Sequence, residues 1–344
     1  MDVQPMLAKA SPTVPGPDDK GGPFAYEPKW DGFRAIVSYD GEDVEIGSRG
    51  AKPLTRYFPE LVAVLKAQLP GPCVVDGEVV VRSGKAGAEK LDWESLSQRI
   101  HPAESRITKL SQETPASFIA FDLIEVDNES LLDVPFVQRR ERLKQFLKGV
   151  KPPLHLTQVT QDVELARRWL VEFEGAGLDG VVSKPLAAPY SPGKRTMIKT
   201  KHHRTADVVL TGYRIHKSGH GVGSLLVGLY GEDGTLIGIG GVSAFTDKRR
   251  LELIDELAPL VVRDSDGNAV TGEKDRNRFT SSKDTSFVEL RPERVLEIRY
   301  DQMEGWRLRH AGIFERWRLD RDPKSCTYEQ LEVPAAYDFG ELVR

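Results

Sequence analysis

The chain has 344 residues, of which 39% are apolar, enough to build two ordinary hydrophobic cores. Cys73 and Cys326 stand far apart without metal-type spacing, so they indicate no disulfide framework and fit a reducing cytoplasm. A formal net charge of −4 excludes a uniformly basic nucleic-acid coat, so a polyanion would have to meet a local patch. The N-terminus lacks the features of a leader, and no apolar run reaches membrane-spanning length, which predicts an intracellular protein without membrane partners.

The chain is predicted to begin with an irregular segment and then to enter a sheet. Proline and glycine are frequent between residues 12 and 23, a composition typical of an irregular lead-in. Residues 33–39 and 44–48 are short β-like runs on either side of Asp40-Gly41, which predicts a hairpin. Apolar residues at helical spacing predict a helix over residues 57–68.

Just ahead of this hairpin, a lysine lies among charges of both signs. The stretch reads Tyr26-Glu27-Pro28-Lys29-Trp30-Asp31-Gly32-Phe33-Arg34. We interpret Lys29 as a nucleophile, a role that requires burial or neighbouring cations, because an ordinary lysine is protonated at neutral pH. Gly32 has no Cβ and therefore permits a sharp turn or a close approach of the backbone to a ligand. The alternative is a surface lysine beside a turn, since Lys-x-Asp-Gly alone is a short motif.

Two further predicted strands carry acidic residues that apolar packing does not require. Residues 74–81 form an apolar run interrupted by Asp76 and Glu78, and residues 117–124 carry Phe121 beside an acid. Buried carboxylates need a cation, a sugar hydroxyl or a metal as partner, so both strands are candidates for a site. The alternative for the first is a hairpin tip with its turn at Asp76 and with Glu78 in water. Phe121 is either a core residue or a platform on which a base stacks.

Two amphipathic helices are predicted next. They cover residues 136–147 and 162–173, and Asp162 is placed to cap the second helix. The chain then returns to a strand, in which Asp179 stands directly before a glycine. This is the third strand in which an acid accompanies an apolar run.

The most basic window of the sequence covers residues 194–204 and contains no acid. Lys199 and Lys201 within it would share one face of a strand. Two ammonium groups held side by side repel each other unless an anion lies between them. The window therefore favours a phosphate site over a solvated edge strand.

The rest of the chain, residues 206–344, is predicted to form a second domain. Its elements suit a small barrel with one helix: strands over 208–215, 224–230, 236–242 and 295–300, and a helix over 247–257. Such barrels can present a basic groove to nucleic acid. Candidate phosphate contacts are Arg214, His216, Lys217, Lys283, Arg291 and Arg294. The polar loop over 263–286 indicates no function.

In order and spacing, these motifs resemble those of the covalent nucleotidyltransferases, which include ATP-dependent DNA ligases, RNA ligases and mRNA capping enzymes. The motifs are Lys29-Trp30-Asp31-Gly32-Phe33-Arg34, Ser48-Arg49-Gly50, Asp76-Gly77-Glu78, Phe121-Asp122, Asp179-Gly180-Val181-Val182-Ser183-Lys184 and Lys199-Thr200-Lys201. The resemblance covers nearly the whole chain. It is closest to bacterial ATP-dependent DNA ligases, the stand-alone ligase C type and the ligase domain of ligase D. This finer resemblance lies in the opening Pro5-Met6-Leu7-Ala8 and in the ending Phe314-Glu315-Arg316-Trp317-Arg318-Leu319-Asp320-Arg321-Asp322-Pro323.

The resemblance implies a chemistry for the lysine. Lys29 would attack the α-phosphate of ATP, expel pyrophosphate and hold AMP as a phosphoramidate. AMP would then pass to the 5′-phosphate of a nick in duplex DNA, where the 3′-hydroxyl would displace it. Lys199 and Lys201 would flank the α-phosphate and lower the pKa of Lys29.

The resemblance also implies roles for the other residues. Glu27 would lie near the adenine edge, Arg34 and Arg49 would bind the ribose-phosphate or the nick 5′-phosphate, Glu78 would accept from a ribose hydroxyl, Phe121 would stack on adenine, and Lys184 would line the nucleotide site. Asp179 and Glu78 would hold a divalent metal, Mg²⁺ or Mn²⁺. Arg316, Arg318 and Arg321 would lie over the departing pyrophosphate.

The fold class implied is α+β. An adenylation (nucleotidyltransferase) domain with antiparallel sheets and flanking helices would cover residues 1–205, and a β-barrel OB-fold domain carrying the C-terminal motif would cover residues 206–344. ATP and the metal would be the cofactors and nicked duplex DNA the partner, in DNA repair and recombination. A repair polymerase or an end-binding protein would be a further partner, and the protein would be cytoplasmic and associated with the nucleoid through DNA.

The sequence leaves alternatives and shows departures from the family pattern. An RNA ligase or a capping-type nucleotidyltransferase is the alternative function, because Lys-x-Asp-Gly serves the whole superfamily. A DNA-binding module with an inactive nucleotide site is disfavoured, since the lysines and Glu78 are all present. Asp179 stands where the family more often has Glu, Arg321 where Lys is commoner, and His310-Ala311 replaces a dipeptide that ends in Pro.

Overall fold

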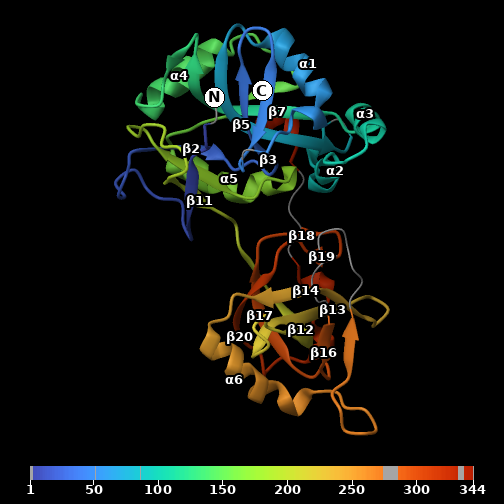
Figure 1. The fold of residues 1–344 in the computed structure, drawn as a ribbon. Coiled ribbons are helices and arrows are strands. Elements are labelled where there is room, and N and C mark those ends of the chain that lie inside the picture. The colour runs from blue at the N-terminus through green and yellow to red at the C-terminus, as the bar shows by residue number, and fades with distance from the viewer. Residues whose placement is uncertain (1–2, 51, 86, 274–285, 332–336, 344) are drawn as a thin grey trace. The chain divides into compact units, whose positions relative to one another are not determined.

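The computed structural model divides into two compact units, drawn in Figure 1. It describes residues 3–50, 52–85, 87–273, 286–331 and 337–343. The first unit contains the described residues up to His202 together with residues 337–343, the C-terminal segment, and the second unit begins at His203. The C-terminal segment, which the sequence placed in the second domain, therefore packs in the first, because Phe339 and Leu342 are fully buried there.

Two sheets form the framework of the first unit. The smaller sheet has the order β1-β11-β10-β2, with β1 parallel to β11 and the other neighbours antiparallel. Its strands are β1 (Leu7–Ser11), β2 (Phe24–Pro28), β10 (Val181–Pro185) and β11 (Arg195–Thr200). The larger sheet has the order β4-β3-β5-β7-β8, with β6 beside β5 and β9 beside β7. Its strands are β3 (Phe33–Tyr39), β4 (Val44–Ser48), β5 (Cys73–Ser83), β6 (Lys90–Leu91), β7 (Ala116–Val126), β8 (Glu129–Ser130) and β9 (Leu154–Leu156).

Helices cover these sheets and close two cores. They are α1 (Pro59–Gln68), α2 (Trp93–Gln98), α3 (Glu104–Glu113), α4 (Phe136–Phe146), α5 (Val163–Glu172) and α7 (Phe339–Leu342), with short 3₁₀ turns at Thr55–Tyr57 and Phe173–Ala176. α1 and α4 pack Leu61, Leu65 and Leu143 against the larger sheet (Figure 1). A second core joins residues of both sheets to α5 and α7.

The acidic strand β5 resolves an alternative that the sequence left open. Asp76 and Gly77 lie in the middle of its eleven residues, and the Asp76 side chain is fully buried. A Cβ on Gly77 would lie 2.3 Å from the Phe118 ring, so only glycine fits this close approach. The hairpin-tip interpretation is therefore wrong, and the buried-strand interpretation is confirmed.

The second unit is built on a closed barrel. Strands β12 (Arg204–Ile215), β13 (Val222–Tyr230), β14 (Leu236–Ser243), β20 (Gly312–Trp317) and β17 (Val295–Tyr300) pair in a ring, because β12 also pairs with β13. β14 is parallel to β20, and α6 (Asp247–Leu257), followed by a 3₁₀ turn at Ala258–Leu260, lies between β14 and β17 in the chain. A five-stranded barrel with one such helix is an OB-fold, as predicted.

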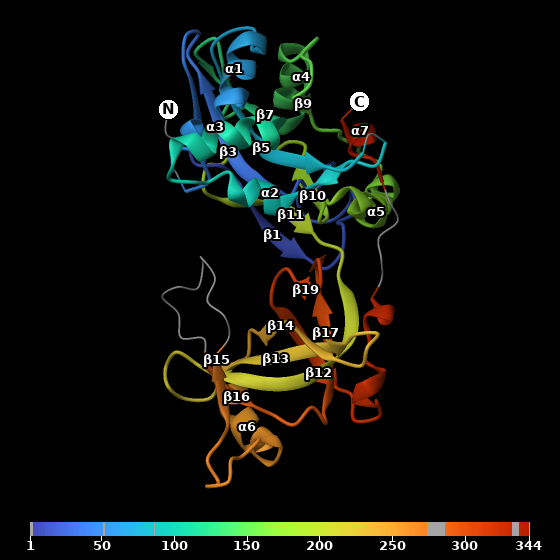
Figure 2. The ribbon, with the colours of Figure 1, turned by 90° about the vertical axis from the view of Figure 1, so that its right-hand side faces the viewer.

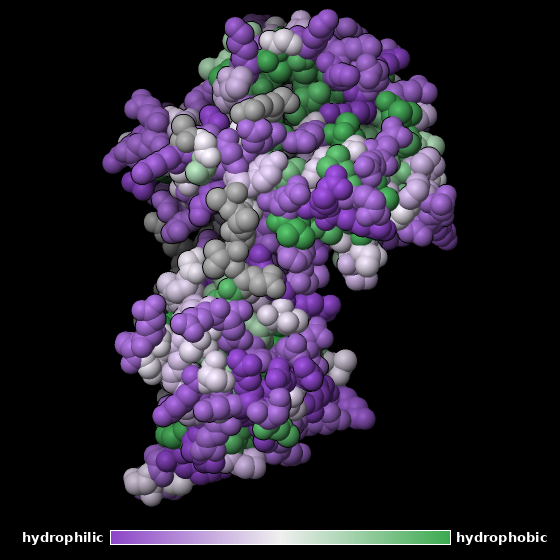
Figure 3. Space-filling model, turned by 180° about the vertical axis from the view of Figure 1, so that it is seen from behind, coloured by the Kyte–Doolittle hydropathy of each residue, from purple (hydrophilic) through white to green (hydrophobic). Residues whose placement is uncertain are grey.

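Smaller elements complete this unit. Two strand pairs, β15 (Thr271–Glu273) with β16 (Ser286–Glu289) and β18 (Met303–Glu304) with β19 (Arg307–Leu308), extend from it, and 3₁₀ turns follow at Pro323–Ser325 and Tyr328–Gln330. Half of the polar loop, residues 274–285 with the candidate contact Lys283, lies outside the described residues. Hydrophilic side chains cover most of the face drawn in Figure 3. None of the described helices has the length and apolarity needed to cross a membrane.

Candidate active site

Lys29 lies in the crossover between the two sheets, after β2 and before β3. Its N–H donates to the Gly180 carbonyl at 2.8 Å, and its own carbonyl accepts from Asp179 N–H at 3.4 Å. Gly180 has φ +152°, and a Cβ there would lie 2.1 Å from the Thr200 carbonyl oxygen. At Gly32 a Cβ would lie 2.2 Å from the Val79 carbonyl oxygen, so this glycine lets the Lys29 loop pack on β5.

A cavity of about 320 Å³ opens beside Lys29. It gathers residues from strands of both sheets and from the connections beside them: Glu27, Lys29, Arg34, Arg49, Glu78, Phe121, Lys184 and Lys199. Apolar walls are supplied by Met6, Trp30 and Met197, among others. Its size is at the lower end of the range for small-molecule sites, and its charged lining suits a polar ligand.

Asp179 holds two of the predicted lysines. Lys29 Nζ lies 2.6 Å from Asp179 Oδ1, and Lys201 Nζ lies 2.9 Å from Asp179 Oδ2. Burial alone would raise the pKa of Asp179, but the charges of Lys29 and Lys201 outweigh it and hold that pKa below its ordinary value. The anion between Lys29 and Lys201 is thus a carboxylate of the protein itself.

Two further cations face the cavity without a carboxylate partner. Within the described part of the chain, neither Lys199 nor Arg49 makes an ion pair, and both line the cavity. Burial lowers the pKa of Lys199, and the nearby charges of Lys29 and Lys201 lower it further. Lys201 follows the end of β11, so Lys199 faces the cavity whereas Lys201 binds Asp179. Unpaired cations of this kind favour an anionic ligand.

One wall of the cavity contains a buried ion pair. Lys184 Nζ lies 2.7 Å from Glu27 Oε2, with both side chains 4% exposed. The Lys184 ammonium also lies 4.7 Å from the centre of the Phe121 ring. Burial raises the pKa of Glu27, although Lys184 counteracts it. Glu27 Oε1 has no hydrogen-bond partner among the described residues, which leaves one acceptor on this wall unused.

Arg34 is held by an acid that the sequence had not paired with it. Its Nε and Nη2 donate to the two carboxylate oxygens of Asp76, both at 2.6 Å, and Tyr190 O–H donates to Asp76 Oδ2 at 2.6 Å. The guanidinium carbon of Arg34 lies 4.4 Å from the centre of the Phe121 ring. Two cations therefore lie over the Phe121 ring. A base that stacks on this ring has to share its faces with them or displace one of them.

Glu78 lies opposite Arg34 across the β3–β5 pair. Gly32 N–H donates to its Oε1 at 3.2 Å, and burial raises the pKa of Glu78 to about 8, against the opposing charges of Arg34 and Lys29. Glu78 is therefore largely protonated at neutral pH in this state. No cluster of three or more potential metal ligands occurs in the described ranges, so a metal here would have one or two carboxylates at most. That number fits Mg²⁺, which keeps waters and binds substrate phosphates.

The C-terminal arginines lie in the second unit, and each is paired there. Arg316 Nε lies 2.5 Å from Glu297. Arg318 lies 2.9 Å from Asp207 and 2.9 Å from Asp320, and Arg321 lies 3.5 Å from Asp207. Asp207 on β12 therefore joins two of these arginines. They are not part of the lining of the cavity described above.

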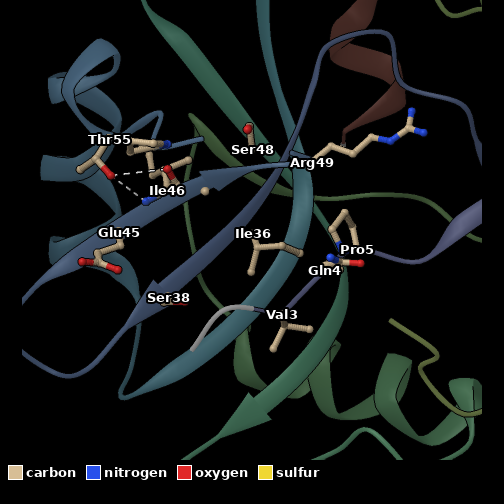
Figure 4. Close-up of a pocket in the computed structure, with 12 residues that line it drawn as sticks. Val3, Gln4, Pro5, Ile36, Ser38, Glu45, Ile46, Ser48, Arg49 and Thr55 are labelled. Carbon is tan, nitrogen blue, oxygen red and sulfur yellow. Dashed lines mark hydrogen bonds between the residues drawn. The ribbon is translucent and has the colours of Figure 1, made fainter. Parts of the chain in front are cut away.

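A second cavity of about 250 Å³ adjoins the first through Pro5 and Arg49, which line both (Figure 4). Figure 4 shows Arg49 extending from the end of β4, away from Glu45 and Thr55. Glu45 and apolar residues such as Ile36 line this cavity, and Arg49 is the single cationic side chain among the described residues that line it. The first cavity is therefore the better candidate for a phosphate-bearing ligand.

Sequence reasoning missed the residues that support the cavity. Tyr190, whose hydroxyl accepts from Met6 N–H at 3.3 Å, carried no recognisable signal, and Met6 stood out only as part of the opening Pro5-Met6-Leu7-Ala8 of the family resemblance. Asp76 stood out as an acid in an apolar strand, but its partner Arg34 could not be read from spacing. The alternative of Lys29 as an ordinary surface lysine does not fit its cavity position.

Comparison with known proteins agrees with this arrangement. A family model described as ATP dependent DNA ligase domain matches residues 5–201, and one described as ATP dependent DNA ligase C terminal region matches residues 218–321. DNA ligase C1 of Mycolicibacterium smegmatis is 52% identical, covering 99% of this chain and 97% of that protein. DNA ligase C of Mycobacterium tuberculosis is 49% identical with the same coverage. A solved structure of Lig E DNA ligases has a TM-score of 0.56 at 17% identity, covering 92% of this chain and 100% of that chain, and supports the fold alone.

Fold and site together define the class, an adenylation domain followed by an OB-fold domain. The chain belongs to the ATP-dependent DNA ligase family, and its similarity to ligase C proteins extends over nearly its full length. This membership favours a DNA ligase over the capping-type and RNA-ligase alternatives.

Proposed function

We propose that this protein seals 5′-phosphate/3′-hydroxyl nicks in duplex DNA through a lysyl-AMP intermediate on Lys29. The observation that carries the proposal is the cavity, in which Lys29 lies beside two unpaired cations, Lys199 and Arg49. Phosphoryl and nucleotidyl transfer depend mainly on alignment and charge neutralisation, and this lining supplies both. A role in DNA repair and recombination rests on the resemblance to ligase C and ligase D alone.

In the first step, the Lys29 amine attacks the α-phosphorus of ATP. An N–P bond forms, and the bond from the α-phosphorus to the bridging oxygen breaks with its electron pair leaving on pyrophosphate. The ammonium loses one proton to water before the attack and the attacking nitrogen loses a second, so that one N–H remains in the phosphoramidate. Before it reacts, Lys29 has to release the Asp179 carboxylate that it contacts at 2.6 Å. Lys199 and Lys201 would then neutralise charge on the α-phosphate.

The adenosine would occupy the wall formed by Glu27, Lys184 and Phe121. The unused Oε1 of Glu27 is an acceptor, which suits the exocyclic amine of adenine, while guanine presents an oxygen at that position. Stacking on Phe121 requires a cation to leave the ring. Arg34, at 22% side-chain exposure, is freer to do so than Lys184, at 4%. Arg34 and Arg49 would then serve the ribose-phosphate or the nick 5′-phosphate.

Asp179 is the carboxylate best placed to hold a divalent metal, with Glu78 joining it once deprotonated. Bound Mg²⁺ or Mn²⁺ would stabilise negative charge on the phosphates. Asp179 is one methylene shorter than the commoner Glu, so a water between carboxylate and metal suits this site.

In the remaining steps, the DNA 5′-phosphate displaces Lys29 from AMP, and the 3′-hydroxyl then displaces AMP from the DNA. The barrel would contact the DNA backbone through basic side chains such as Arg214 and His216. Arg291 and Arg294 are less available, because they pair with Glu293 at 2.7 Å and Glu256 at 3.5 Å.

The test is incubation of the purified protein with labelled ATP and, separately, with labelled GTP. A covalent adduct of one AMP that maps to Lys29, and that disappears when nicked DNA is sealed, is the expected result. Transfer of GMP would support a capping enzyme instead. No adduct from either nucleotide, with metal present, would contradict the proposal.

A further inference from the structure

The C-terminal segment is joined to the first unit by hydrogen bonds of its main chain and of the Asp338 side chain, as well as by buried side chains. Phe339 N–H donates to the Glu89 carbonyl at 2.8 Å, and Glu89 N–H donates to Asp338 Oδ1 at 3.0 Å. The amide of Gln158 donates to the Leu342 carbonyl at 2.9 Å, at the end of α7. Figure 2 shows α7 beside α5. The segment is therefore docked at a defined position and register.

Phe339 enters a cluster of rings behind the cavity. Its ring centre lies 6.0 Å from that of Trp30 and 5.9 Å from that of His155, both in edge-to-face geometry, and the Arg82 guanidinium lies 5.5 Å away. Phe339 is fully buried. Burial, together with Arg82, lowers the pKa of His155 to about 4, so this neighbour is neutral at physiological pH. The cluster is an apolar socket that Phe339 completes.

Trp30 connects this socket to the nucleophile. It directly follows Lys29, is 5% exposed, and also lines the cavity. Its indole N–H donates to Thr157 Oγ1 at 2.8 Å, and Phe339 packs against its ring. On the side of Lys29 away from Trp30, the Lys29 N–H donates to the Gly180 carbonyl. The backbone from which Lys29 extends is thus fixed at two points, and one of them depends on Phe339.

We propose that Phe339 is a positioning residue for Lys29, which acts by holding Trp30. The proposal rests on the proposed function, because it concerns the step in which Lys29 attacks ATP. Displacing a reacting group by about 1 Å can slow a reaction roughly a hundredfold. Without the Phe339 ring, Trp30 loses one wall of its socket, and Lys29 loses a fixed position relative to the α-phosphorus.

A purely structural role predicts something different. Loss of a buried phenylalanine lowers the stability of the whole unit, so it reduces every activity in proportion to the fraction that unfolds. A positioning role affects the two steps in which the bond between Lys29 and AMP forms or breaks. It spares the sealing of a nick that already carries 5′-AMP, because Lys29 forms no bond in that step. It also spares the KM for ATP, because the charged lining of the cavity is unchanged.

The experiment compares Phe339→Ala with Phe58→Ala in the full chain. Phe58 is also fully buried in the first unit and also contacts a guanidinium, that of Arg99 at 4.8 Å, but it belongs to the other core. Below the melting temperature of both variants, Phe339→Ala should slow lysyl-AMP formation at saturating ATP about tenfold or more. Its KM for ATP and its sealing of preadenylated nicks should stay within about twofold. Phe58→Ala should change neither rate, and Phe339→Leu should recover most of the loss.

The outcomes separate this inference from the proposed function. If wild-type protein forms no AMP adduct, the proposed function fails and this inference fails with it. If wild-type protein forms the adduct and Phe339→Ala forms it equally fast, or if Phe339→Ala and Phe58→Ala lose both steps in parallel, only the positioning role is wrong. If Phe339→Ala is unfolded at the assay temperature, the same comparison is made with Phe339→Val and Phe58→Val.

Discussion

Asp179 explains how several cations coexist in a small cavity. It binds Lys29 and Lys201 at 2.6 and 2.9 Å, while Lys199 and Arg49 stay unpaired within the described residues. The Asp179 carboxylate thus holds two ammonium groups in place. The unpaired cations would provide the excess positive charge that attracts a phosphate chain. The proposed nucleophile and the proposed attracting charges are therefore separate residues.

Replacing the nucleophile gives the first prediction. Lys29→Ala should form no AMP adduct and should not seal a 5′-phosphate nick, because no other group in this scheme bonds to AMP. Lys29→Arg should not restore either reaction, since a guanidinium stays protonated and cannot attack phosphorus. Labelling with radioactive ATP measures the adduct. Lys66→Ala, a partly exposed lysine that pairs with Asp43, is the control and should label normally. Labelling of Lys29→Ala would show that another lysine is the nucleophile.

A second prediction concerns the pH dependence of stability at Glu78. Its pKa is raised to about 8 by burial, above the value of about 4.5 expected in the unfolded chain. The folded state therefore binds this proton more tightly, so the stabilisation is complete below pH 4.5 and is lost as pH rises through 8. Glu78→Gln has no carboxyl group to ionise and therefore avoids this loss. The difference in melting temperature between Glu78→Gln and wild type should be larger at pH 8.5 than at pH 5. An equal shift at both pH values would show that Glu78 is ionised in the folded protein.

The residues of the site divide into those that sequence could identify and those that it could not. Glu78 and Lys199 were predicted because a charge in an apolar strand or in a window of one sign needs a chemical reason, and Lys29 was predicted from its Lys-x-Asp-Gly motif together with the motifs that follow it. The pairing of Asp76 with Tyr190 is a contact between residues far apart in the chain, and spacing carries no record of it. The same holds for the docking of Phe339 against Trp30.

Among the elements, prediction succeeded where alternation or helical periodicity persists over a whole segment. β3, β4, β17 and α6 have the predicted bounds. The short helices α2 and α3 were missed, because six to ten residues with sparse apolar positions give little periodic signal. α7 has only four residues and is helical because its neighbours bury it.

Helix α5 gives a prediction at this scale. Asp162 caps it, accepting from Glu164 N–H at 2.8 Å and Leu165 N–H at 3.3 Å, as the sequence suggested. Asp162→Ala leaves these donors to water and should lower the free energy of unfolding by about 1 kcal/mol. Denaturant titration measures the change. Asp162→Asn keeps an acceptor oxygen and should lose much less; an equal loss in both variants would mean that the charge, and not the cap, stabilises the helix.

At the scale of the whole molecule, the chain joins the two units twice, because the C-terminal segment returns to the first unit after the barrel is complete.

If the barrel binds DNA mainly through backbone phosphates, sealing should weaken steeply as salt rises, whereas adenylation needs only ATP and metal and should weaken less. Rates of both steps between 50 and 200 mM salt, about the range over which such contacts are lost, measure the difference. Equal salt sensitivity would count against a separate DNA-binding surface.

Substitution of a C-terminal arginine allows self-adenylation and the final sealing step to be tested separately. By the family resemblance, Arg318 would act on pyrophosphate, a group present only in the first step. In the second unit, Arg318 lies between Asp207 and Asp320, each at 2.9 Å, so it has to exchange a carboxylate for the phosphate. Arg318→Ala should slow self-adenylation about a hundredfold, the scale for removing one strong electrostatic donor, and should still seal a nick with preformed 5′-AMP.

The matched control for that prediction is Arg249→Ala, which removes a guanidinium paired with Glu256 at 2.9 Å on α6 of the same unit and should leave both reactions intact. Lys199→Ala should lose both reactions, because the α-phosphate, which Lys199 would face in the proposed mechanism, takes part in each of them. Sealing of the preadenylated nick by Arg318→Ala also shows that the second unit is still folded once the contact with Asp207 is gone. If Arg318→Ala fails equally on preadenylated nicks, the arginine acts beyond pyrophosphate, and the assignment of this motif to the first step has to be abandoned.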